Sequence, residues 1–304
     1  MPYAKAVVLS ALICVLIVLT LLAVWRQLER AYLFAPVGGQ PRPALRGVVE
    51  GRLDRLHLWV IEAPRPDAPA VVFFHGNFGN LEHTTPFVEL LSGLGTHVVS
   101  FDYSGYGVSG GTPSTEQILS DGLLVYEHAR LRWPASRIIL WGHSLGTAVA
   151  TYVAGHVPRD AGACSALVLM APFYALSELG RDFGGFYHVA SAIFSRLVNM
   201  LPTNEWIRRV DCPIAIVHSL RDPLISFRHA MMLYDELTEM RLAQGFGRAE
   251  VRRSLLLIPT EGNHSCCLLS CEQLATLAAF LGLAPQMDEC ARLLEAAHLA
   301  PECQ

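Results

Sequence analysis

The segment Trp141-Gly142-His143-Ser144-Leu145-Gly146-Thr147 decides the fold, because it places a serine between two glycines where one structural pattern gives way to another. The preceding residues, 137–141, form a run of apolar and β-branched residues typical of a buried strand, and residues 145–157 have a helical pattern. A tight strand-to-helix turn requires small residues on either side, which the two glycines supply. The pattern therefore predicts a turn that presents the hydroxyl of Ser144 at the end of a strand.

Apolar runs of strand length alternate with helical patterns along the rest of the chain. The runs lie at 70–74, 97–101, 137–141, 166–170, 213–217 and 254–258. The helical patterns lie at 86–94, 115–131, 145–157, 229–242 and 271–281. Strands that alternate with helices predict an α/β fold with a mainly parallel sheet covered on both faces. Ligands of such sheets bind outside the carboxyl ends of the strands.

Two polar residues follow later strand runs and complete a possible catalytic set with Ser144. Asp222 lies after the fifth run and His264 after the sixth, so all three residues are expected at carboxyl ends of strands. A serine hydroxyl is a weak nucleophile until a base removes its proton, and the order Ser, Asp, His suits this fold. We expect His264 to be the base and Asp222 to orient it. The rivals His218 and Asp211 are less well placed, within and before a strand.

The stretch Phe74-His75-Gly76-Asn77-Phe78 follows the first long apolar strand and is the expected source of an oxyanion-binding N–H group. We expect the backbone N–H of Asn77 to be one donor, with Phe78 as second choice. The backbone N–H of Leu145 is the other expected donor. His75 is interpreted as a structural brace of this loop.

The N-terminal region carries no charge from residue 6 to residue 25, a run of 20 residues. Such a run is long enough to cross a membrane as one helix, and it is longer than the apolar region of a signal peptide. We expect a single-pass anchor at 1–30, whose orientation the flanking charges leave open. A linker at 31–46 and a folded domain at 47–285 should follow, with a C-terminal tail at 286–304. Residues 172–204 are rich in aromatic side chains and are expected to form a cap inserted over the site.

Composition limits the possible partners of this chain of 304 residues. The formal net charge is −4, so no basic surplus indicates nucleic-acid binding. The eight cysteines form no C-x-x-C pair, and we find no motif for a metal or a cofactor. The sequence contains no signal for an oligomeric state.

Five segments together resemble the α/β-hydrolase family. They are 75–77, 101–109, 142–146, 221–224 and 263–264. The resemblance is greatest to the membrane-associated proteins that contain an α/β-hydrolase domain. That group includes protein depalmitoylases and lysophospholipid or monoacylglycerol lipases. The resemblance runs from about residue 47 to 283 and implies that Ser144, Asp222 and His264 form a catalytic triad. It implies hydrolysis of an ester or thioester through an acyl-enzyme, on a lipid or acylated substrate. This chain departs from the family in a longer segment at 241–253 and in Asn263, where glycine is common.

Two other functions remain open from the sequence. Serine peptidases share this fold, although they often carry a large accessory domain. A binding protein could keep the fold without the chemistry, although such proteins usually lack a member of the triad. The aromatic residues of 172–204 could also simply pack the interior of the cap rather than contact a lipid.

Overall fold

The computed structural model describes residues 33–40, 43, 45–157, 164–182, 201–264, 267–283 and 287–298, and single helical positions between 12 and 29. The strands are β1 (Ala35–Pro36), β2 (Val49–Leu53), β3 (Leu56–Ile61), β4 (Ala70–Phe74), β5 (Phe78–Gly79), β6 (His97–Phe101), β7 (Ile138–His143), β8 (Ala166–Met170), β9 (Ile214–Ser219), β10 (Leu255–Gly262) and β11 (Cys267–Leu268). The α-helices are α2 (Thr85–Gly93), α3 (Thr115–Arg130), α4 (Leu145–His156), α5 (Leu176–Asp182), α7 (Thr203–Trp206), α8 (Arg228–Ala243), α9 (Arg248–Ser254), α10 (Cys271–Phe280) and α11 (Met287–His298). Short 3-10 helices lie at Leu81–Thr84, Ala135–Arg137 and Ile207–Arg209.

Within the described residues, one sheet of nine strands has the order β11-β10-β9-β8-β7-β4-β6-β3-β2. The six strands from β10 to β6 pair in parallel, and the pairs β2–β3, β3–β6 and β10–β11 at the edges are antiparallel. The predicted mainly parallel sheet is therefore confirmed. Because the central strands are parallel, their carboxyl ends meet at one edge of the sheet, where the functional residues were expected.

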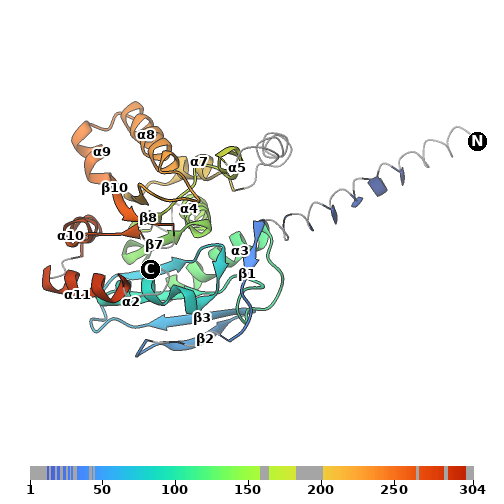
Figure 1. Ribbon diagram of the computed structural model, residues 1–304, viewed down its shortest axis with the longest axis horizontal. Coiled ribbons are helices and arrows are strands. Elements are labelled where there is room, and N and C mark those ends of the chain that lie inside the picture. The colour runs from blue at the N-terminus through green and yellow to red at the C-terminus, as the bar shows by residue number, and fades with distance from the viewer. Residues whose placement is uncertain are drawn as a thin grey trace, which may run out of the picture.

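Helices cover both faces of this sheet, which explains why β4 and β8, two of its central strands, are apolar and buried at every position. In β4, Val72 and Phe74 point into one core and Val71 and Phe73 into the other. The first core is closed by α3, α4 and α8, and the second by α2, α10 and α11. Figure 1 shows α2 and α11 side by side, with α10 next to α11.

Several elements of the structure were not expected from the sequence, among them α9, β1 and α11. The unusually long segment before the last central strand contains the short helix α9, whose Val251 is buried in the first core. The expected linker contains β1, which pairs in parallel with β5. The expected C-terminal tail contains α11, and its residues Cys290 and Leu294 are buried in the second core. β1 and α11 depend on contacts between segments far apart in the sequence, so no local pattern reveals them.

Two predicted features fall largely on residues that the structure does not describe. Among the described residues, no helix has the length and apolar character that crossing a membrane requires. Much of the predicted anchor lies outside them, although the described large apolar side chains at 12–24 are exposed. Residues 183–200 of the expected cap also lie outside, and only its flanks, α5 and α7, are described.

Candidate active site

Ser144 lies at a strained turn between β7 and α4. Its backbone has φ 52° and ψ −119°, in the region that side-chain-bearing residues rarely adopt. The Ser144 N–H donates a hydrogen bond to the carbonyl of Met170 at 2.9 Å, which ties the turn to the end of β8. The turn places Ser144 at the carboxyl end of β7, where the sequence predicted it.

Close backbone contacts explain why glycine flanks this serine. A Cβ atom on Gly142 would lie 2.4 Å from the carbonyl oxygen of Gly146. A Cβ atom on Gly146 would lie 2.0 Å from the carbonyl oxygen of Phe74, the last residue of β4. Helix α4 therefore crosses the neighbouring strand at a separation that only glycine permits.

His264 joins Ser144 and Asp222 through its two ring nitrogens. Its Nε2 lies 2.8 Å from Ser144 Oγ, and its Nδ1 lies 2.8 Å from Asp222 Oδ2. An ionised carboxylate can only accept, so Nδ1 carries the proton and Nε2 is left to accept the proton of the serine hydroxyl. The three predicted residues, which are up to 120 positions apart, are thus brought into one hydrogen-bonded chain.

Asp222 is held as a carboxylate by its neighbours. Its side chain has no exposed surface, and its Oδ1 accepts hydrogen bonds from the N–H groups of Leu224 at 2.8 Å and Ile225 at 2.9 Å. Burial raises the pKa of Asp222, but hydrogen bonds from His218 and His264 lower it further, so the net shift is downward. The rival His218 lies 3.4 Å from Asp222 Oδ2 and donates its Nε2–H to the Ile225 carbonyl at 2.8 Å. It therefore supports the acid rather than replacing His264.

The loop expected to bind an oxyanion lies directly against the serine. A Cβ atom on Gly76 would lie 3.5 Å from Ser144 Cβ, so the peptide that joins Gly76 to Asn77 is adjacent to the nucleophile. Leu145 is the first residue of α4, and the first N–H groups of a helix have no partner within it. Phe78, the second choice, lies in β5 with 69% of its surface exposed.

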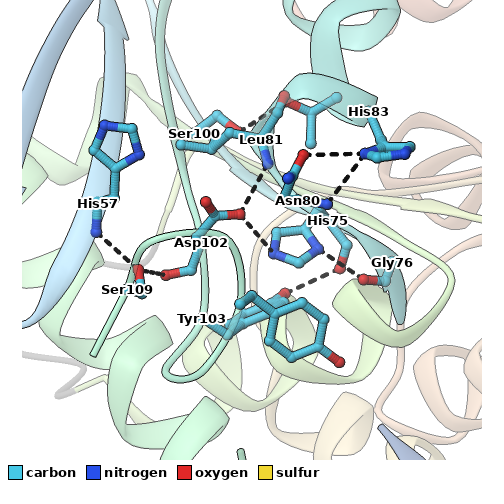
Figure 2. Close-up of polar contacts among 12 residues, drawn as sticks. His57, His75, Gly76, Asn80, Leu81, His83, Ser100, Asp102, Tyr103 and Ser109 are labelled. Carbon is cyan, nitrogen blue, oxygen red and sulfur yellow. Dashed lines mark hydrogen bonds and ion pairs between the residues drawn. The ribbon is translucent and has the colours of Figure 1, made fainter. Parts of the chain in front are cut away.

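A buried polar cluster holds this loop from behind (Figure 2). His75 donates its Nδ1–H to the Gly76 carbonyl at 2.7 Å, and Tyr103 donates its hydroxyl to the His75 carbonyl at 3.1 Å. The other ring nitrogen of His75 points toward Asp102 Oδ1 at 3.9 Å. Burial lowers the pKa of His75 to about 4 and raises the pKa of Asp102 to about 7. These contacts agree with a bracing role for His75.

His143, the residue directly before Ser144, was not among the residues predicted from the sequence to belong to the site. Its side chain is partly buried, and burial together with the nearby His264 lowers its pKa to about 4. Its Nε2–H donates to the backbone carbonyl of His264 at 3.0 Å. The position of His143 within the serine motif indicated that its side chain lies near the site. Its hydrogen-bond partner could not be predicted, because His264 is 121 residues away in the sequence. Among the described residues, no group of three or more His, Cys, Asp or Glu side chains could hold a metal ion.

The strained serine turn, the acid and base in chain order and the mainly parallel sheet define an α/β hydrolase. A family model described as serine aminopeptidase, S33, matches residues 65–208. This match and the relatives below support an assignment to the α/β-hydrolase family of serine hydrolases.

Particular relatives are more informative about this chain's place in the family. It is 30% identical over 234 residues to human Protein ABHD12B, covering 73% of this chain and 63% of that protein. It is 31% identical over 201 residues to rat lysophosphatidylserine lipase ABHD12, covering 62% of this chain and 50% of the relative. The chain thus spans between half and 63% of the length of these curated relatives. The Pyrococcus furiosus esterase Pf2001 shares the fold, with a TM-score of 0.60, 21% identity and coverage of 82% of this chain and 95% of that chain.

Proposed function

We propose that this chain is a serine hydrolase that cleaves acyl esters or thioesters through an acyl-enzyme. The hydrogen-bonded chain from Ser144 through His264 to Asp222, with both contacts at 2.8 Å, carries this proposal. His264 Nε2 accepts the proton as Ser144 Oγ attacks the acyl carbon, and Asp222 stabilises the imidazolium that forms. His264 then gives the proton to the departing alcohol or thiol. Water attacks the acyl-enzyme by the same route and releases the acid.

The developing negative charge on the carbonyl oxygen needs fixed donors. The backbone N–H groups of Asn77 and Leu145 are proposed to supply them, the second with the added field of the α4 N-terminus. Each such donor stabilises the transition state by about 3–4 kcal/mol in related chemistry. The adjacency of Gly76 to Ser144 supports this assignment.

We propose a lipophilic acyl substrate: a lysophospholipid, a monoacylglycerol or an S-acylated protein. The name of the rat relative, a lysophosphatidylserine lipase, supports the lipid class. The uncharged run at 6–25 supports attachment to a membrane through a single N-terminal helix. The proposed organisation is an anchor at 1–30, a linker at 31–46 and a hydrolase domain from 47, with a cap at 172–204. The domain then extends beyond 285, because α11 packs against it.

Labelling with a fluorophosphonate probe tests the proposal. We expect the detergent-solubilised wild-type protein to be labelled and Ser144→Ala not to be, with esterase activity reduced by at least about 10³-fold. Equal labelling of both proteins would exclude Ser144 as the nucleophile. A panel of lysophosphatidylserine, monoacylglycerol, an S-palmitoyl peptide and an aminoacyl nitroanilide then identifies the substrate class. Preference for the nitroanilide would favour a peptidase, as the description of the matching family model suggests.

A further inference from the structure

Residues 33–39, which we call the N-terminal strap, lie along the loop expected to bind the oxyanion. Within the strap, β1 pairs in parallel with β5, and the Val37 N–H donates to the Gly79 carbonyl at 3.2 Å. The other end of the strap is bonded to Gly107, which donates to the Val37 carbonyl at 3.0 Å and accepts from the Gly39 N–H at 3.2 Å. The strap is therefore fixed to two separate loops of the domain.

Buried side chains fix the chain at and before the strap. Phe34 is 5% exposed and belongs to the first core. Glu29, 6% exposed, accepts hydrogen bonds at Oε1 from the N–H of Thr115 at 2.8 Å and from its hydroxyl at 2.6 Å. These bonds satisfy a donor in the first turn of α3, where a negative charge is favoured. Glu29, which precedes the strap, is therefore also attached to the domain.

The side chain of Asn77 connects the strap to the active site. Its Oδ1 accepts hydrogen bonds from the Ala35 N–H at 3.1 Å and from the Tyr106 hydroxyl at 2.9 Å. Tyr106 is fully buried, and its ring packs edge-to-face against His75 with centroids 5.2 Å apart. One oxygen thus receives two donors from segments far apart in the chain, which restricts the movement of Asn77.

Small movements of Asn77 matter because its backbone N–H is the proposed oxyanion donor. A donor stabilises the transition state only when it is held at hydrogen-bond distance from the developing charge before the reaction occurs. A displacement of about 1 Å at such a site can cost about 10²-fold in rate. The side chain of the next residue, Phe78, is exposed to solvent, so packing of that side chain does little to hold the loop in place.

We propose that the N-terminal strap is a positioning element of the active site, which acts through the Asn77 side chain to hold the Asn77 backbone N–H toward the substrate carbonyl. This inference rests on the proposed hydrolase function. The segment next to the proposed anchor then helps to position an active-site donor rather than serving only as a tether.

A double-mutant cycle in the full-length, detergent-solubilised protein tests this coupling. Ala35→Pro removes one N–H donor to Asn77, and Asn77→Ala removes the acceptor while it keeps the backbone N–H. We expect each change to lower kcat for p-nitrophenyl butyrate by roughly 10- to 100-fold with KM changed less than about twofold. The double variant should be no slower than Asn77→Ala alone, because both changes break the same contact.

Two matched controls separate positioning from a general loss of structure. Ala35→Ser keeps the N–H and should keep the wild-type kcat, since residue 35 is exposed. Asn77→Asp keeps an acceptor oxygen and should recover most of the kcat that Asn77→Ala loses. This second comparison holds even if Ala35→Pro fails to fold.

The outcomes are distinct. If Ala35→Pro lowers the melting temperature without lowering kcat, or if the two losses are additive, the strap has only a structural role and the inference is wrong. If Asn77→Ala and Asn77→Asp have the same kcat, the inference is also wrong. A wild-type protein that is neither active nor labelled by fluorophosphonate would instead overturn the proposed function, and the inference with it.

Discussion

The imidazole of His143 donates a hydrogen bond to the backbone carbonyl of His264 at 3.0 Å. The two rings lie 5.5 Å apart, centroid to centroid. The residue before the proposed nucleophile therefore holds the loop that carries the proposed base. A charge on His143 would oppose the imidazolium that His264 forms during the reaction, and burial keeps His143 neutral by lowering its pKa to about 4.

Loss of this contact should slow the reaction without preventing folding. We expect His143→Leu to lower kcat by about tenfold with little change in KM, because the base is less well held. His143→Gln retains an N–H donor and should recover part of the loss. Steady-state kinetics on a short-chain ester measure both, and equal values for the two variants would contradict the positioning role.

The strained backbone of Ser144 predicts a conflict between stability and activity. Glycine adopts the observed φ of 52° more readily than a residue with a side chain. We expect Ser144→Gly, although inactive, to melt about 2–4 °C above Ser144→Ala, which corresponds to about 1 kcal/mol. Scanning calorimetry measures the two melting temperatures, and because both variants are inactive, a difference in catalysis cannot affect the comparison. A lower melting temperature for the glycine variant would show that the turn is not strained.

The close approach of α4 to β4 predicts that Gly146 tolerates no side chain. We expect Gly146→Ala to destabilise the fold by about 3 kcal/mol or more, because the added methyl group meets the Phe74 carbonyl. Gly51→Ala in β2 is the matched control, since a Cβ atom at that position would have no other atom within 4 Å. Urea unfolding should place the control within about 0.5 kcal/mol of the wild type. Similar losses in both variants would argue against the steric explanation.

Buried neutral histidines should make the protein less stable in acid. The pKa of both His75 and His143 is lowered to about 4, against about 6.5 in an unfolded chain. Between these values the unfolded state binds more protons, so the free energy of unfolding falls as the pH drops from 6.5 to 4. Each residue contributes at most about 3 kcal/mol to this loss.

Replacement by a group that does not titrate tests the assignment. We expect urea midpoints of His75→Gln and His143→Gln to vary less between pH 7 and pH 4.5 than the wild-type midpoint does. Asp102, whose pKa is raised to about 7, acts in the opposite direction and is present in every variant, so the difference between proteins isolates the histidines. Parallel pH curves for all three proteins would rule out the two imidazoles as the source.

Much of the fold could be predicted because its signals are local. The β4 run from Ala70 to Phe74 is apolar at every position because the strand is buried on both faces of the sheet. Such a run is recognisable in the sequence alone. The motif around Ser144 combines a strand, a turn and a helix within a few residues. Helix α11 could not be assigned in the same way, since its burial depends on packing against α2, some two hundred residues earlier in the chain.

For the candidate site, the sequence by itself determined which residues stand at strand ends: Ser144, Asp222 and His264, in the order that is typical of this fold. These positions could be predicted because residue type and the apolar pattern of a strand are local properties of the sequence. Only the tertiary structure decided how these residues meet, which nitrogen of His264 faces which partner, and that His143 supports the base. It also placed the strap against Asn77, since hydrogen bonds between distant segments depend on how the whole chain packs.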